Sequence, residues 1–147
     1  MTPIRHRLPL LAALAASTAL AAAPAIAQDA RCPPLPAGSG LHWQQQAGDG
    51  FVVCRARDGE RQVLGLMLTA KPTIKPLRRN RREEGHVGSH QVRWYQPDIT
   101  DGGGEYKRVA VVELGEDRYA QVWIDPLSED ELQRLLADRG LLDALAR

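Results

Sequence analysis

The stretch that decides the fold runs through residues 106–125, YKRVAVVELGEDRYAQVWID. Residues 106–114 and 118–125 are rich in β-branched and aromatic side chains, which favour β-strands. Gly115-Glu116-Asp117 between them consists of residue types that are common in turns. The two runs are therefore expected to form a β-hairpin.

A second hairpin is expected upstream of the first. Residues 51–57 (FVVCRAR) and 61–69 (RQVLGLMLT) read as strands, and Asp58-Gly59-Glu60 joins them as a turn. Gly65 lies inside the second of these strands, which indicates a bulge or a close backbone approach. Residues 91–96 (QVRWYQ) predict one further short strand.

The C-terminal segment has the pattern of a capped amphipathic helix. Ser128 can cap its N-terminus, and Glu131 three residues later completes a capping box. Gly140 either ends the helix or weakens it. The apolar positions recur at helical spacing and predict a stripe that covers one face of the sheet: Leu132, Leu135, Leu136 and Leu142.

These elements predict the α+β fold class. Neighbouring hairpins favour an antiparallel sheet, and a single helix has to bury its apolar stripe against one face of it. We therefore expect one small domain with a sheet of about five strands, two hairpins plus one strand, and a C-terminal helix packed on one face.

Residues 1–27 have the pattern of a bacterial Sec-type signal peptide. Arg5 and Arg7 precede a run of Leu and Ala over residues 8–23, and Ala25-Ile26-Ala27 supplies small residues for a peptidase. The run is too short for a comfortable membrane span. Cleavage is expected before Gln28, which predicts a periplasmic or secreted protein. Residues 28–50 then form a Pro/Gly-rich N-terminal arm without a regular element, and residues 51–147 form the α+β domain.

The charge balance argues against a nucleic-acid partner. The chain has 19 Lys and Arg against 18 Asp and Glu, and without Arg5 and Arg7 the balance becomes 17 against 18. A domain this close to neutral lacks the basic surplus that favours nucleic acid. No second apolar run of spanning length follows, so no transmembrane segment is expected after signal cleavage.

The only cysteines, Cys32 and Cys54, are expected to form a disulfide. Two cysteines in an exported chain allow one intramolecular pairing. Closing a loop of about 22 residues contributes ~3 kcal/mol in the chain-entropy model. Redox and zinc sites favour a C-x-x-C spacing, which the chain lacks.

The stretch 70–91 shows no apolar periodicity and is expected to be a long loop, a feature that is often functional in a compact domain. A solvated surface is the alternative reading of its charges. The basic side chains within residues 71–82 could hold an acidic protein or another anionic envelope component: Lys71, Lys75, Arg78, Arg79, Arg81 and Arg82.

Three aromatic residues are further candidates for partner contact. Trp94 and Tyr95 are consecutive on a strand, so one should enter the core and the other should lie on the outer face. Trp123 stands between Val122 and Ile124, so it should face away from the main apolar side. Outward aromatics suit a protein partner; the alternative is that the arm carrying Trp43 covers them.

A metal site at His86 and His90 is a weaker hypothesis. Four-residue spacing suits zinc on a helix, but two glycines lie in this stretch and the glutamate of H-E-x-x-H is absent. We expect no metal, no cofactor and no catalytic residue. The sequence thus favours a non-catalytic exported binding or accessory protein, such as an inhibitor, an immunity-type protein or an envelope-complex component. The alternative is a metal-assisted hydrolase that uses His86, His90 and a carboxylate.

Overall fold

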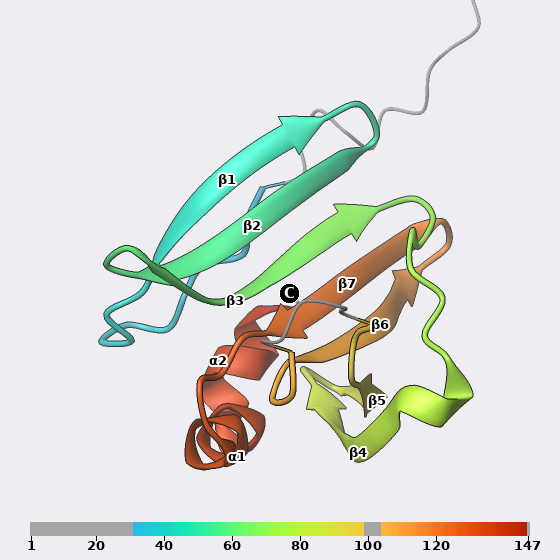
Figure 1. The fold of residues 1–147 in the computed structure, drawn as a ribbon. Helices are drawn as coiled ribbons and strands as arrows, with labels where there is room; N and C mark the ends of the chain where they lie inside the picture. Colours follow the sequence, from blue (N-terminus) through green and yellow to red (C-terminus); the bar gives the residue numbers. More distant parts are fainter. Residues whose placement is uncertain (1–30, 99–103, 147) are drawn as a thin grey trace, which may run out of the picture.

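The computed structural model describes residues 31–98 and 104–146, so the expected signal peptide lies outside the described residues. A seven-stranded antiparallel sheet in the order β1-β2-β3-β7-β6-β5-β4 makes up most of the fold (Figure 1). Two short helices follow the last strand. The α+β class is thus confirmed in outline, but the sheet has seven strands rather than about five.

The elements follow one another along the chain as strands, one short 3-10 turn and two helices. Their bounds are β1 His42–Gly48, β2 Phe51–Asp58, β3 Arg61–Thr69, η2 Arg78–Asn80, β4 Arg81–Val87, β5 His90–Tyr95, β6 Arg108–Gly115, β7 Arg118–Ile124, α1 Glu129–Ala137 and α2 Arg139–Ala144.

Both expected hairpins are present, and they lie side by side in the sheet. β2 pairs with β3, β6 pairs with β7, and β3 pairs with β7 to join the two hairpins. The short strand expected over residues 91–96 is β5. The alternating apolar pattern was sufficient to find these strands because each of them buries one face.

The prediction that residues 28–50 form an arm without a regular element is wrong for β1. This strand pairs with β2 along its whole length, from His42 opposite Arg57 to Gly48 opposite Phe51. Its sequence, HWQQQAG, has little apolar content because the strand lies at the edge of the sheet and is largely exposed. An edge strand is stabilised mainly by its backbone pairing, so its side chains carry a weak strand signal.

The prediction of one long loop over residues 70–91 is wrong for its second half. Residues 81–87 form β4, the opposite edge strand, which pairs with β5 through a turn at Gly88 and Ser89. Gly88 has a φ of 59°, which favours glycine at this turn. The strand was missed because four charged residues, RREE, open it and give no apolar alternation.

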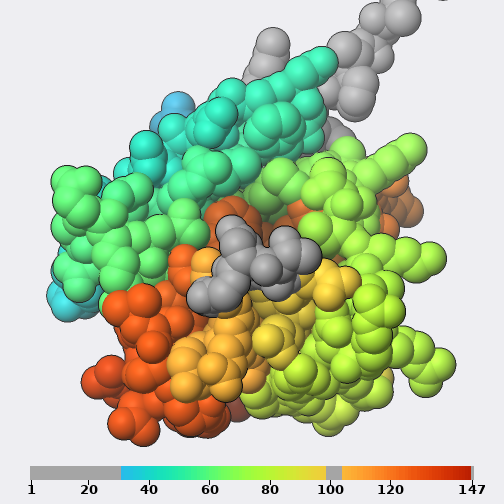
Figure 2. Space-filling view, in the orientation of Figure 1, coloured from blue at the N-terminus to red at the C-terminus, as the bar shows by residue number. Residues whose placement is uncertain are grey.

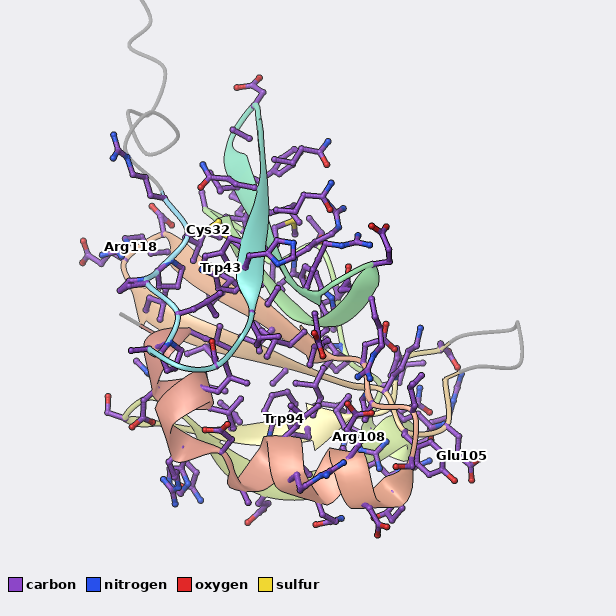
Figure 3. The ribbon with its side chains drawn as sticks, turned by 90° about the vertical axis from the view of Figure 1, so that its left-hand side faces the viewer. Cys32, Trp43, Trp94, Glu105, Arg108 and Arg118 are labelled. Carbon is purple, nitrogen blue, oxygen red and sulfur yellow. A yellow bond between two sulfur atoms is a disulfide. The ribbon has the colours of Figure 1, made fainter. Side chains whose placement is uncertain are left out.

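One face of the sheet, which we call the inner face, carries the core. Leu64, Leu66, Val122 and Ala110 lie on it and are fully buried. The helices cover one part of this face with apolar side chains such as Leu132, and the arm covers another part (Figure 1, Figure 3). The expected packing of the C-terminal stripe on one face of the sheet is confirmed.

The expected helix cap is present, but the helix is interrupted. Ser128 Oγ accepts a hydrogen bond from the Glu131 backbone N–H at 3.3 Å. α1 ends at Ala137, and Asp138 then caps α2 through a bond from Leu141 N–H to its Oδ1 at 3.0 Å. Gly140 therefore lies inside the second helix and does not end the first.

The arm is held to the inner face by a disulfide and an indole hydrogen bond (Figure 3). Cys32 and Cys54 are joined, with a Cα–Cα distance of 5.7 Å, as the sequence predicted. Trp43 Nε1–H donates to the Pro33 carbonyl oxygen at 2.6 Å. The bridge and the indole together fix the start of the described chain against β1 and β2.

Candidate functional site

The connection from β3 to β4 crosses the other face of the sheet, which we call the outer face. Gln121 of β7 is 3% exposed and holds this connection in place. Its side-chain oxygen accepts hydrogen bonds from the backbone N–H groups of Thr73 at 3.0 Å and Ile74 at 2.8 Å. Gln121 Nε2 in turn donates to Thr73 Oγ1 at 2.9 Å. A buried amide thus fixes a segment that lacks regular structure.

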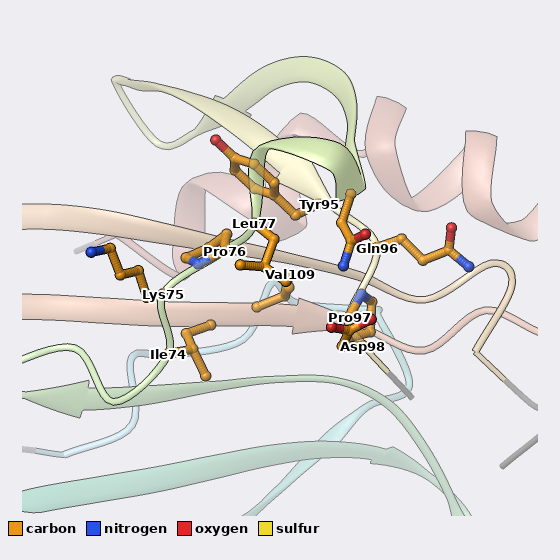
Figure 4. A pocket seen from close by; sticks show the side chains of 10 residues that line it. Ile74, Lys75, Pro76, Leu77, Tyr95, Gln96, Pro97, Asp98 and Val109 are labelled. Carbon is orange, nitrogen blue, oxygen red and sulfur yellow. The ribbon is translucent and has the colours of Figure 1, made fainter. Parts of the chain in front are cut away.

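A groove opens between this crossing segment and the end of β5 (Figure 4). Ile74, Pro76 and Leu77 line one side, while Tyr95 and Val109 line the sheet side. The described pairing of β5 with β6 consists of Tyr95 opposite Val109, so these two lining residues are direct cross-strand neighbours. Its volume of about 420 Å³ falls within the range of protein ligand sites.

The groove holds two of the three exposed large hydrophobic residues of the described chain. Ile74 is 38% exposed and Leu77 is 40% exposed, whereas Leu127, which is 69% exposed, stands apart just before α1. Exposed apolar side chains that cluster around a hollow indicate a contact surface more strongly than an isolated exposed apolar side chain does. The sequence signal for this groove is the pair of large apolar residues, Ile74 and Leu77, in a proline-punctuated loop, and neither residue was among the predicted contact residues.

Polar and charged groups surround the apolar floor of the groove. Gln96 N–H donates to the Asn80 carbonyl oxygen at 2.8 Å, which fixes η2 against the end of β5. Arg79 forms an exposed ion pair with Asp98 at 3.3 Å. Lys75 also lines the groove, and Arg78 begins η2 beside it. The lining thus contains one cation, Lys75, and one anion, Asp98, and the adjacent η2 adds the cations of Arg78 and Arg79.

The arginines predicted as one loop surface are divided between two elements. Arg78 and Arg79 are exposed in η2, whereas Arg81 and Arg82 open strand β4. The part of the chain to which η2 and β4 belong is coloured yellow-green in Figure 2 and forms the right-hand side of that view. Arg81 forms an ion pair with Glu84 at 3.3 Å. The expectation that all four lie in a loop is therefore wrong for Arg81 and Arg82, because the pairing of β4 with β5 draws these two into the sheet edge.

The three candidate aromatics have different environments. Trp94 is 1% exposed and belongs to the core, so it cannot be part of a contact surface. Tyr95 points to the opposite face and lines the groove, as the alternation predicted for one of the pair.

Trp123 lies on the outer face, where its ring covers Gly65. A Cβ added at Gly65 would lie 2.3 Å from the indole ring, which confirms the predicted close approach at this glycine. The described part of the arm, residues 31–50, does not cover Trp123, since Cys54 and Trp43, which anchor it, face the inner side. The alternative that the arm covers the outward aromatics is therefore wrong.

His86 and His90 do not converge. In the β4–β5 hairpin His86 is opposite Gln91 and His90 is opposite Val87, so the two imidazoles lie on opposite faces. Across residues 31–98 and 104–146, the structure groups no three side chains of the types that bind metal ions. The geometry therefore gives no support to the hydrolase alternative.

A buried ion pair links β4 to β6 on the inner face and was not anticipated from the sequence. Arg108 is 6% exposed, and its Nε and Nη2 donate to the two carboxylate oxygens of Glu83 at 2.8 and 2.9 Å. Burial raises the pKa of Glu83, but the hydrogen bonds and charge of Arg108, together with a backbone hydrogen bond and the charge of Arg82, outweigh it, so the pKa lies below its ordinary value. The pair lies on the face of the sheet opposite the groove.

The chain has no match among protein-family models, curated proteins or solved structures. The described helices are all too short to cross a membrane.

Proposed function

We propose that this protein is a non-catalytic binding module that holds an extended, acidic segment of an envelope protein in the groove between residues 74–77 and β5. The observation that carries the proposal is the exposure of Ile74 and Leu77 above a hollow of about 420 Å³. The backbone at this point is fixed by Gln121, so the groove exists before any partner binds. A preformed site lowers the entropic cost of association.

The acidic character of the proposed segment follows from the rim. Among the ion pairs of the described residues, Arg79 has Asp98, while Lys75 and Arg78 have no carboxylate partner. Apolar side chains of the segment would contact Leu77 and Tyr95, and its carboxylates would lie near the two cations. Such charge complementarity accelerates association and selects the partner.

The proposed site of action is outside the cytoplasm. The Cys32–Cys54 disulfide fits an oxidising compartment, and the pattern of residues 1–27 predicts export. If the leader is cleaved as proposed, the intact mass of the exported protein will correspond to a chain that begins at Gln28. A mass that includes residues 1–27 would contradict this part of the proposal.

The groove can be tested with labelled model peptides. We expect a fluorescent peptide of alternating leucine and glutamate to bind, and its leucine–lysine counterpart to bind far more weakly. Leu77→Asp should weaken binding of the first peptide at least about tenfold, because it places a carboxylate in the apolar floor beside an acidic ligand. Leu127→Asp is the matched control, since Leu127 is more exposed and lies outside the groove.

The role of the cations is tested separately. Lys75→Gln with Arg78→Gln should weaken binding of the acidic peptide and reduce its salt dependence, with the melting temperature unchanged. Equal binding of both peptides, or an equal loss in Leu77→Asp and Leu127→Asp, would rule out the groove. Binding to phosphatidylglycerol vesicles without peptide binding would replace the protein segment with a lipid surface.

A further inference from the structure

Within residues 31–98 and 104–146, strand β1 is an edge of the sheet, and its own sequence carries none of the usual features that discourage pairing. It is the outermost strand in the order, and it pairs with β2 in an unbroken register over all seven residues. Its sequence, HWQQQAG, contains no Lys, Arg, Asp, Glu or Pro. Edge strands usually avoid association through charges, prolines or bulges, and β1 has none of these.

The opposite edge shows the contrast within the same sheet. β4 carries Arg81, Arg82, Glu83 and Glu84, and its register with β5 shifts between Arg81 and Glu84. Charges and a local irregularity of this kind discourage a further strand from adding at an edge. The two edges of the sheet therefore differ, and only β1 lacks features that discourage a further strand from pairing.

The backbone groups that β1 presents outward follow from its hairpin. Gly48 and Phe51 close a two-residue turn, so they form a hydrogen-bonded pair, and every second residue along β1 does the same. Trp43, Gln45 and Ala47 then direct their N–H and C=O groups away from β2. The Trp43 bond to Pro33 and a bond from Cys32 N–H to Gln45 Oε1 at 3.3 Å hold the strand in place.

We propose that β1 pairs antiparallel with β1 of a second copy of this chain, about a two-fold axis at Gln45. Gln45 is the middle residue of the strand, so this register pairs all of its residues. Gln44 is then opposite Gln46 of the other copy, and Trp43 is opposite Ala47, a large side chain against a small one. The proposal is independent of the groove, which lies toward the other edge of the sheet.

The charges near the seam are compatible with this pairing. Arg55 Nη1 donates to Gln46 Oε1 at 3.2 Å, and Arg57 Nη1 donates to Gln44 Oε1 at 3.4 Å. Gln44 lies opposite Arg55 within one copy, and Gln46 lies opposite Val53. In the proposed register, the four residues in line across the seam are therefore Arg55 and Gln44 of one copy, then Gln46 and Val53 of the other. No two arginines stand directly opposite each other, so neutral glutamines separate the cationic groups.

The proposal is tested by sedimentation velocity on protein expressed from the full chain and purified oxidised. The wild type should dimerise reversibly with concentration. Gln44→Lys with Gln46→Lys should weaken the dimer at least about tenfold, because like charges are then opposite each other across the seam. Gln44→Lys with Gln46→Glu is the matched control and should dimerise, because it brings opposite charges together in the same register.

A mixing experiment isolates self-pairing from any other association. Gln44→Glu with Gln46→Glu should also dimerise poorly alone, but should form a heterodimer when mixed with the double lysine variant. Circular dichroism and melting temperature of each variant verify that the monomer is folded. A wild type that stays monomeric at all concentrations, a dimer insensitive to these charges, or failure of the mixed pair to associate would overturn the proposal.

Discussion

Replacing Glu83 with Gln should reveal how much the buried ion pair stabilises the fold. Arg108 is 6% exposed, and Glu83 accepts two of its N–H bonds at 2.8 and 2.9 Å. The remaining guanidinium nitrogen, Nη1, donates to the carbonyl oxygens of Glu105 and Lys107, each at 3.0 Å. Glu83→Gln keeps the shape of the side chain but removes the charge that compensates this buried cation.

The expected loss of unfolding free energy depends on how far each side chain of the pair is buried. Breaking a fully buried ion pair by removing one partner costs about 3–5 kcal/mol, because the other charge is left uncompensated. The Glu83 side chain is 32% exposed, so water can reach its position and lower the cost. We expect Glu83→Gln to reduce the free energy of unfolding by about 2 kcal/mol, a large part of the stability of a small domain.

Urea denaturation of the oxidised protein at neutral pH measures this cost. Glu84→Gln is the matched control, because Glu84 is an exposed neighbour that pairs with Arg81 at 3.3 Å. We expect its effect to stay within about 0.5 kcal/mol. Glu83→Leu combined with Arg108→Met should recover most of the loss of Glu83→Gln, since an apolar pair leaves no buried charge.

The same pair should produce a pH dependence of known sign. The pKa of Glu83 is below its ordinary value of 4.5, so the folded state favours the ionised form. Its contribution is therefore complete above the unfolded pKa and is lost as pH falls through the lower folded pKa. As pH falls from neutral to below 4.5, wild type should lose more stability than Glu83→Gln.

Two results would refute the reasoning about the ion pair. A Glu83→Gln cost as small as that of Glu84→Gln would show that solvent already compensates Arg108. If wild type and Glu83→Gln lost the same stability on acidification, the pKa of Glu83 would not differ between the folded and unfolded states.

Two further predictions concern the close packing and the covalent link of the sheet. Gly65→Ala should destabilise the protein by about 1–3 kcal/mol, because its Cβ would lie 2.3 Å from the Trp123 ring and 2.8 Å from the Cys54 carbonyl oxygen. Gly140→Ala is the control and should leave the melting temperature equal or higher, because no neighbour lies closer than 3.6 Å to its added Cβ. Equal melting temperatures of the two variants would contradict the close approach at Gly65. Replacing Cys32 and Cys54 with Ser should cost about 2–4 kcal/mol in urea denaturation, and a loss below about 1 kcal/mol would mean that the arm holds without the bridge.

Local sequence patterns were sufficient for the central part of this fold. The hairpins β2–β3 and β6–β7 alternate apolar residues around short turns, so each was recognisable within about 20 residues of chain. The cap of α1 was recognisable from Ser128 and Glu131 because its hydrogen bond spans three residues. The Cys32–Cys54 bridge followed from counting, since two cysteines leave one pairing.

The edge strands and the order of the sheet were decided by tertiary structure. β1 and β4 have exposed, polar sequences that carry no alternation, and they exist because β2 and β5 satisfy their backbone groups. The pairing of Glu83 with Arg108 likewise depends on β5 lying between their strands. No local pattern contains that information.

The groove shows the same division most clearly. The sequence by itself determined that residues 70–77 would lack regular structure, because prolines and charges interrupt them. Only the tertiary structure decided that Ile74 and Leu77 remain exposed at a hollow, because Gln121, 47 residues from Ile74, accepts the backbone bond that holds the segment across the outer face. A hydrogen bond between the Gln121 side chain and the Ile74 backbone cannot be recognised from the local sequence around either residue.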